Sequence, residues 1–197
     1  MNDGLALVTG AGRGAGRAAA LALGAAGARV AAIDVNPDAA ERTAAEAGVG
    51  STAHTVDVSN KMAVQTLLFS LLEAGERLEL LVNAAHVAPA STALKMDEWE
   101  WNRTLDVNLK GAFLMSQTVA RAMKETGGGL ILNLLRPDDS SHAAVRAARA
   151  GLLGLTQAMQ AEWAPFGVQV EALALSGDPA LAAAEIVARL LTWRKAA

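Results

Sequence analysis

The chain has 197 residues, of which 52% are hydrophobic, so it is long enough to form one domain with a substantial buried core. Its net charge of −3 arises from scattered residues, which argues against a surface for nucleic acid or anionic membrane. Cysteine is absent, and the N-terminus lacks a signal-like segment, so we expect a cytoplasmic protein without disulfides. No stretch approaches the ~20 apolar residues of a membrane-spanning helix. We expect a single domain over residues 1–197.

Apolar runs of strand length alternate with helix-length segments along the whole chain. This alternation is typical of βαβ units, and it predicts an α/β fold with helices on both faces of a parallel sheet. The predicted strands cover Leu5–Val8, Arg29–Asp34, Thr52–Val58, Leu78–Asn83, Leu130–Leu135 and Val168–Leu175. The predicted helices cover Gly14–Ala26, Pro37–Ala47, Lys61–Glu73, Asp97–Glu125, Ser141–Pro165 and Pro179–Trp193.

A glycine-rich loop joins the first predicted strand to the first predicted helix. Glycines let a backbone approach a pyrophosphate closely, and the N–H groups at a helix start attract its charge. For the loop alone, an ordinary glycine turn is the alternative interpretation. The residues expected to bind a dinucleotide here are Gly10, Gly12, Arg13, Gly14, Ala15 and Gly16.

The second predicted strand ends in Asp34, which is followed by Val35. This is the place for an acid that binds the adenosine ribose of a dinucleotide. Because a carboxylate repels a 2′-phosphate, Asp34 favours NAD(H) over NADP(H). Arg13 and Arg17 favour the phosphate instead, but we give Asp34 more weight because it would touch the ribose directly.

The form Thr-Gly-x-x-x-Gly-x-Gly at residues 9–16 resembles the short-chain dehydrogenase/reductase family. Other segments resemble that family in the same order along nearly the whole chain: 57–58, 81–86, 106–111, 128–133, 154–156 and 165–170. The resemblance implies a Rossmann-type three-layer αβα sandwich with a six-stranded parallel sheet of order 3-2-1-4-5-6. It also implies a homodimer that pairs through the fourth and fifth predicted helices. The further cofactor-binding residues implied are Asp57 and Val58, at the adenine, and Asn83, Ala84 and Ala85.

The residues that the family uses for catalysis are largely replaced. The resemblance implies a serine, a tyrosine and a lysine supported by an asparagine, and only the asparagine is kept, as Asn108. Leucines follow Asn133 where the serine is expected, Val145 stands at the tyrosine position, and Arg149 stands at the lysine position. Valine carries no transferable proton, and the chain contains no tyrosine at all. Loss of a positioned acid typically costs ~10²–10⁴ in rate.

Arg149, at the lysine position, and the retained Asn108 each have an alternative interpretation. Arg149 can bind ribose hydroxyls, but its permanent charge prevents it from relaying protons. Asn108 is also expected to kink its helix and hold water, and without its partners we favour that structural role.

His142 is a candidate substitute acid. It lies about one helical turn before Val145, and histidine as a residue type is suited to acid–base catalysis near neutral pH, with Ser140 or Ser141 available to hold a carbonyl. The alternative makes His142 a surface residue of the first helical turn. His54 and His86 lie far from it in sequence with no carboxylate at ligand spacing, so we predict no metal site.

These observations predict a family homologue that binds NAD(H) and has weak or no oxidoreductase activity. It would act as a nucleotide sensor or as the silent partner of an active homologue. The first alternative is a working NAD-dependent oxidoreductase that uses His142 as the acid. The second is a structural or interaction protein that binds no nucleotide, against which Asp34 and the glycine loop argue. The sequence identifies neither a substrate nor a partner protein.

Overall fold

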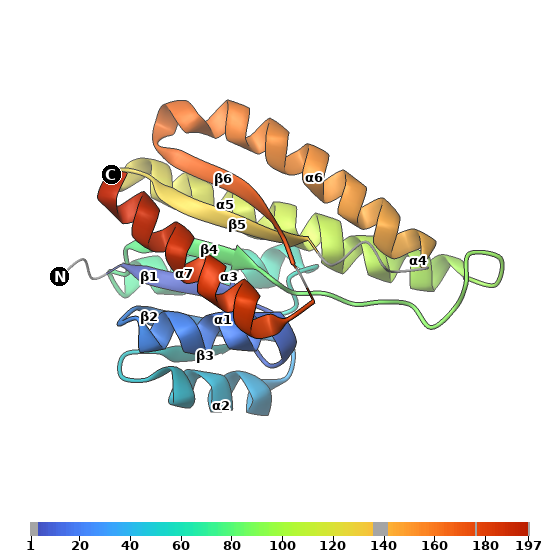
Figure 1. Ribbon diagram of the computed structural model, residues 1–197, viewed down its shortest axis with the longest axis horizontal. Coiled ribbons are helices and arrows are strands. Elements are labelled where there is room, and N and C mark those ends of the chain that lie inside the picture. Colours follow the sequence, from blue (N-terminus) through green and yellow to red (C-terminus); the bar gives the residue numbers. More distant parts are fainter. Residues whose placement is uncertain (1–3, 136–141, 176, 197) are drawn as a thin grey trace.

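Six parallel strands form the centre of the computed structural model, which describes residues 4–135, 142–175 and 177–196. The strands are β1 (Leu5–Thr9), β2 (Arg29–Asp34), β3 (Thr52–Thr55), β4 (Leu78–Asn83), β5 (Gly129–Leu135) and β6 (Val168–Ala174). Their order is β3-β2-β1-β4-β5-β6, and every neighbouring pair is parallel (Figure 1). Both the fold class and the strand order that the sequence predicts are confirmed.

Helices cover both faces of this sheet, which makes three layers (Figure 1). Apolar side chains of α1 (Gly14–Ala25), α2 (Pro37–Ala47) and α7 (Pro179–Ala196) form one core with the sheet. Those of α3 (Lys61–Glu73), α5 (Ala112–Glu125) and α6 (Ala143–Trp163) form the other core. Because both faces are covered, every residue of β1, β4 and β5 is buried, and these strands read as continuous rather than alternating apolar runs.

Side-chain caps fix where several helices begin. The side-chain oxygen of Asn36 accepts a hydrogen bond from the backbone N–H of Ala39 at the start of α2. Asp97 accepts one from Glu100 at the start of α4 (Glu98–Leu105). Each bond satisfies a backbone donor that has no partner within its own helix. Local residues therefore determine these boundaries.

The fourth predicted helix is not continuous. After α4, residues Asp106–Gly111 form a π-helical turn, η1, and α5 follows it. A π turn inserts one extra residue into the helix, and such insertions are frequent at functional sites. The helical segment predicted over Asp97–Glu125 is thus divided, and the irregularity lies at Asn108, the residue expected to kink it.

Other boundaries differ by a few residues. β3 ends at Thr55 and not at Val58, because the chain leaves the sheet once the Val56 N–H has bonded the Asp34 carbonyl at 3.0 Å. The described part of α6 starts at Ala143, and a short 3₁₀ turn, η2 (Ala164–Phe166), contains Pro165 and ends the helical segment. α7 extends three residues beyond the predicted Trp193.

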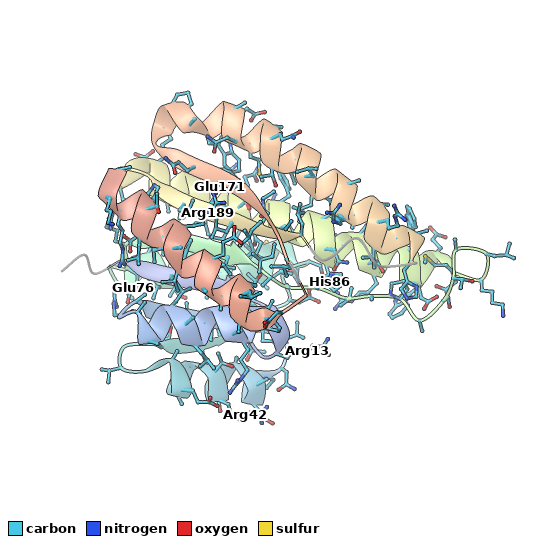
Figure 2. All side chains as sticks on the ribbon, viewed as in Figure 1. Arg13, Arg42, Glu76, His86, Glu171 and Arg189 are labelled. Atoms are coloured by element: carbon cyan, nitrogen blue, oxygen red, sulfur yellow. The ribbon has the colours of Figure 1, made fainter. Side chains whose placement is uncertain are left out.

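The last helix is tied to the sheet by two arginines. Arg194 donates from Nε and Nη2 to both oxygens of Glu79 on β4, at 2.9 and 2.6 Å, and Glu79 is only 1% exposed. The hydrogen bond that it donates to Glu79 raises the pKa of Arg194. Arg189 pairs with Glu171 of β6 at 2.7 Å on the exposed side (Figure 2). The ion pair between Arg194 and Glu79 therefore anchors the end of α7 to β4.

The sheet ends at β6, which is an edge strand within the described residues. The backbone N–H of Val170, on this edge strand, donates a hydrogen bond to Oε1 of Gln160 on α6 at 2.5 Å.

No helix in the described ranges combines the length and apolar character that a membrane span requires.

Candidate functional site

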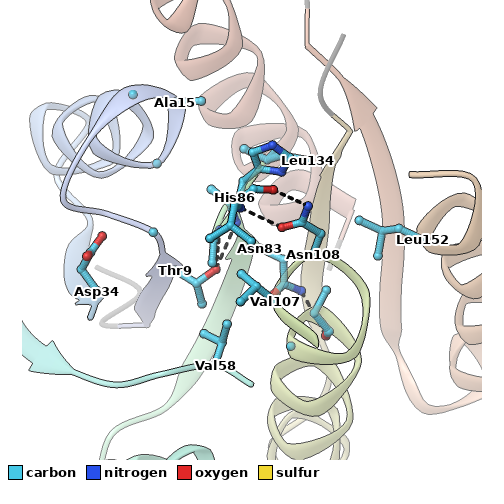
Figure 3. A pocket seen from close by; sticks show the side chains of 18 of the residues that line it. Thr9, Ala15, Asp34, Val58, Asn83, His86, Val107, Asn108, Leu134 and Leu152 are labelled. Carbon is cyan, nitrogen blue, oxygen red and sulfur yellow. Dashed lines mark hydrogen bonds between the residues drawn. The ribbon is translucent and has the colours of Figure 1, made fainter. Parts of the chain in front are cut away.

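A cavity of about 580 Å³ lies where the carboxyl ends of the strands meet (Figure 3). In open α/β sheets this edge, at the point where strand order reverses, is the usual place for a ligand. One end of the cavity is formed by residues that follow β2 and β3, and the other by residues of β5, α6 and the chain after β6. The volume is within the usual range for small-molecule sites.

The glycine loop between β1 and α1 forms the floor of the cavity. A Cβ at Gly10 would lie 2.7 Å from the Cα of Ala85, and its φ of 63° also favours glycine. A Cβ at Gly16 would overlap the carbonyl oxygen of Gly10, so α1 begins in close contact with the loop. Bare backbone at the start of a helix is what a pyrophosphate requires, and the loop fits that group. Arg13, Gly14 and Ala15 also line the cavity.

Thr9 connects the glycine loop to the segment after β4. Its Oγ1 accepts hydrogen bonds from the backbone N–H groups of Ala84 at 3.0 Å and Ala85 at 3.2 Å. Thr9 itself is 1% exposed. This buried hydroxyl places two of the predicted cofactor-binding residues directly beside the loop.

Asp34 is held at one end of the cavity by two backbone donors. Its Oδ2 accepts the N–H of Gly12 at 2.8 Å, and its Oδ1 accepts the N–H of Asn36 at 3.0 Å. Gly12 does not line the cavity, so its part is to orient the carboxylate. Of the two arginines weighed against Asp34, Arg17 pairs with Glu46 at 2.5 Å outside the cavity wall, whereas Arg13 lines it. Val35, next to Asp34, is 58% exposed.

Asp57 and Val58 lie in the wall after β3, together with an arginine that sequence reasoning missed. Nη1 of Arg103, on α4, lies 3.2 Å from Oδ2 of Asp57 and 3.3 Å from Oγ of Ser59. Partial burial alone would raise the pKa of Asp57, but hydrogen bonds from Ser59 and the charge of Arg103 outweigh it and lower the pKa. Arg103 stands one helical turn before Val107, another residue that lines the cavity.

Asn83 lies beneath the cavity in a buried polar network. Its Nδ2 donates to Oδ1 of Asn133 at 2.8 Å, and Nδ2 of Asn133 donates to Oγ1 of Thr156 at 2.9 Å. This network joins β4, β5 and α6. Oδ1 of Asn83 is buried and has no hydrogen-bond partner within the described part of the chain.

Asn108 uses both ends of its amide on one residue. Its Oδ1 accepts the Val87 N–H and its Nδ2 donates to the Val87 carbonyl, each at 2.8 Å. The residue lies in the π turn and is 8% exposed (Figure 3). The side chain therefore holds the segment after β4 against η1, and its polar atoms are already engaged.

The opposite end of the cavity is mainly aliphatic. Leu134, which follows Asn133, lines it together with Leu152 (Figure 3). Val145 and Arg149, at the positions that the resemblance assigns to tyrosine and lysine, belong to the same wall, and His86 lies in the wall after β4. Val145 is 3% exposed. Aliphatic carbon therefore stands at the position that the resemblance assigns to the tyrosine, while Arg149 and His86 contribute polar side chains to the cavity wall.

His142 is not among the described residues that line the cavity. Its Nδ1 lies 3.2 Å from the carbonyl oxygen of Ser91. Ser140 and Ser141, the serines considered with it, lie outside the described residues. Within the described ranges, no group of three or more histidine, aspartate or glutamate side chains is placed to hold a metal ion.

Comparisons with known proteins point to one family. A family model described as short chain dehydrogenase matches residues 4–178. A D-threitol dehydrogenase of Mycolicibacterium smegmatis is 38% identical over 176 residues, covering 86% of this chain and 68% of that protein. An NAD-dependent glycerol dehydrogenase of Listeria innocua is 32% identical over 177 residues, covering 88% of this chain and 70% of that protein.

Solved structures give the same result. A metagenomic short-chain oxidoreductase, crystallised in complex with NADP, superposes with a TM-score of 0.89 at 29% sequence identity. The superposition covers 95% of this chain and 90% of that chain. The similarity therefore extends over the sheet, both helix layers and the cavity.

Proposed function

The chain belongs to the short-chain dehydrogenase family, and from this premise we propose that it binds NAD(H) in the cavity described above. The glycine loop and the start of α1 would hold the pyrophosphate, and Asp34 would hold the adenosine ribose. Asp57 and Val58 would border the adenine. Asn83, Ala84 and Ala85 would border the middle of the cofactor, and Arg149 would hold the second ribose. When bound, the cofactor supplies or accepts hydride.

A preference for NAD(H) over NADP(H) is the second part of the proposal. It rests on the Asp34 carboxylate, which two backbone N–H groups fix at the cavity edge. A 2′-phosphate next to that carboxylate would place two like charges together. Two arginines could instead attract a 2′-phosphate. Arg17 is paired with Glu46, and Arg13 lines the cavity.

We further propose that turnover is weak or absent. The observation that carries this is the aliphatic end of the cavity, where Val145 stands at the position of the proton donor and Leu134 and Leu135 follow Asn133 where a carbonyl-binding serine is expected. The protein would then act as a nucleotide sensor or as the silent partner of an active homologue. The alternative of an active enzyme using His142 gains no support from the position of that residue.

A thermal-shift titration with NAD, NADH, NADP and NADPH tests the binding proposal. A larger rise in melting temperature with NAD(H) than with NADP(H) supports it, because only a ligand of the folded state stabilises the protein. No shift with any of the four at millimolar concentration would favour a structural protein without nucleotide. Turnover is tested separately by NADH oxidation with polyol-derived ketoses, since relatives are named for polyols.

Pairing of two copies through α5 and α6 is the proposed assembly. A groove of about 330 Å³ runs between these helices and is lined by partly exposed apolar residues, among them Phe113, Leu155, Trp163 and Phe166. Light scattering tests the proposal: a dimer mass that Ala158→Arg reduces to that of a monomer supports it. Ala184→Arg, on the exposed side of α7, is the matched control.

A further inference from the structure

The end of the cavity next to β2 and β3 is a slot with apolar walls and a charged edge. Val35 is 58% exposed in this wall, while Val58 and Val107 are 5% and 6% exposed (Figure 3). The carboxylate of Asp57 lies in the same wall. A flat ring with apolar faces and a polar rim, such as a nucleobase, matches this combination.

Three donors hold the Asp57 carboxylate, and they come from two separate elements. Oδ1 accepts the N–H and the hydroxyl of Ser59 at 2.9 and 2.6 Å. Oδ2 lies 3.2 Å from Nη1 of Arg103. Ser59 is local to Asp57, but Arg103 reaches it from α4, so this ion pair fixes the loop after β3 against a helix.

The same helical segment holds the neighbouring residue. A Cβ at Gly111, the last residue of η1, would lie 2.7 Å from Cγ2 of Val58, so Val58 packs against bare backbone there. Arg103 and Gly111 therefore hold the loop that contains Asp57 and Val58 at two points. The position of the carboxylate depends on α4 and η1 as well as on its own loop.

We propose that Arg103 is a positioning residue that determines base specificity through Asp57. This inference rests on the proposed dinucleotide binding. An ionised carboxylate only accepts hydrogen bonds, so it favours a ring edge that carries an amino group and repels a ring oxygen. Arg103 keeps Asp57 where it can accept from the amino group of adenine. Without Arg103 the slot remains, but its polar edge is no longer fixed.

Equilibrium binding of NADH and of its hypoxanthine analogue, in which oxygen replaces the amino group, tests this role. We expect the wild type to bind NADH about tenfold more tightly than the analogue, the size of one charge-assisted hydrogen bond. Arg103→Ala and Asp57→Asn should each remove most of that ratio, and Arg103→Lys should retain part of it. In the double variant Arg103→Ala/Asp57→Asn, no further loss is expected, because Arg103 acts through Asp57.

Arg189→Ala is the matched control, because Arg189 pairs with Glu171 and Glu185 outside the cavity and should leave the ratio unchanged. Thermal melts establish that each variant is folded, and Arg103→Gln replaces Arg103→Ala if that variant does not fold. An unchanged ratio in the Arg103 variant, or additive losses in the double variant, would overturn the role of Arg103 but leave the proposed binding of NAD(H) intact. Failure of the wild type to bind NADH and ADP-ribose would overturn the proposed function and the inference with it.

Discussion

Single residues differ in character between the two ends of the cavity. Gly10 and Gly16 provide bare backbone, and Asp34 a fixed carboxylate, at the end where we propose that the adenosine half of the cofactor binds. Val145 and Leu134 provide buried carbon at the other end. The contrast is chemical, because hydrogen bonding and charge are available at the first end, whereas packing dominates the second.

Replacement of Asp34 by alanine is expected to weaken NADH binding about tenfold, since a charge-assisted hydrogen bond to the ribose is lost. Binding of NADPH should change less, because the repulsion of its 2′-phosphate is removed at the same time. Calorimetric titration of both ligands measures the ratio. Asp38→Ala, on the exposed first turn of α2, is the control, and Asp34→Asn keeps an acceptor for the Gly12 N–H. Equal weakening of both ligands would contradict the assigned role.

His142→Ala is expected to leave any measurable turnover unchanged. The ring of His142 interacts with the Ser91 carbonyl, and the residue is not among the described lining residues. The measurement is the rate of NADH oxidation in the presence of a panel of carbonyl compounds, for wild type and variant together. A loss on the order of 100-fold, as expected for removal of a general acid, would instead make His142 the catalytic residue.

At the scale of elements, the π turn η1 has the largest effect on the site. It lies between α4 and α5, where Asn108 holds Val87 on one side and Gly111 packs against Val58 on the other. Two walls of the cavity are thus attached to one helical segment. Since the Asn108 amide is engaged with backbone, the stability of this arrangement can be measured without any ligand.

Asn108→Ala is expected to lower the free energy of unfolding by about 1–3 kcal/mol, because the Val87 N–H and carbonyl lose their partners in a partly buried setting. Urea unfolding followed by circular dichroism gives the value. The control is Asn102→Ala, an exposed asparagine on the neighbouring α4, which should change stability by less than about 0.5 kcal/mol. Equal midpoints for the two variants would show that the Asn108 contacts contribute no stability.

Sequence patterns predicted those elements whose causes are local. The bounds of α2 and α3 follow from apolar periodicity and from the capping residues Asn36 and Asn60, and both helices lie where they were predicted. The glycine loop was recognisable because its spacing and its place between strand and helix carry the chemistry.

Features that depend on distant contacts were not predictable in the same way. A kink at Asn108 was expected from the resemblance, but the bonds of its side chain to Val87, 21 residues away, are not recorded in the apolar pattern of the helix. Arg103 meets Asp57 across 46 residues, so only the folded chain shows that this arginine belongs to the cavity wall. The predicted end of β3 is too late because the apolar residues Val56 and Val58 continue the pattern of the strand. They lie beyond it, where their side chains line the cavity and pack in the core.

At the scale of the whole molecule, the last helix joins the two ends of the chain. Arg194 of α7 reaches Glu79 on β4, 115 residues earlier, and a Cβ at Gly4 would overlap the Glu79 side chain. This pair is the deepest ionic contact described, with Glu79 at 2% side-chain exposure and Arg194 at 22%. α7 is thereby attached to the centre of the sheet as well as packed on α1.

Glu79→Gln is expected to lower the free energy of unfolding by about 2 kcal/mol, since it leaves the partly buried guanidinium of Arg194 without its counter-charge. Arg189→Gln is the matched control, because its ion pairs with Glu171 and Glu185 are exposed and should contribute under about 1 kcal/mol. Denaturant titration measures both, and hydrogen exchange locates the loosened segment, which should be α7. A loss for Glu79→Gln no larger than for the control would contradict this.

The contact between Gln160 and Val170 bears on how the protein behaves when it is concentrated. An edge strand with open amides is a template on which a second molecule can add a strand, and such additions lead to fibres and precipitates. Here one of the outward amides of β6 is already occupied by a side chain of its own helix α6. A neighbouring molecule that added a strand along β6 would first have to displace Gln160 from the Val170 N–H.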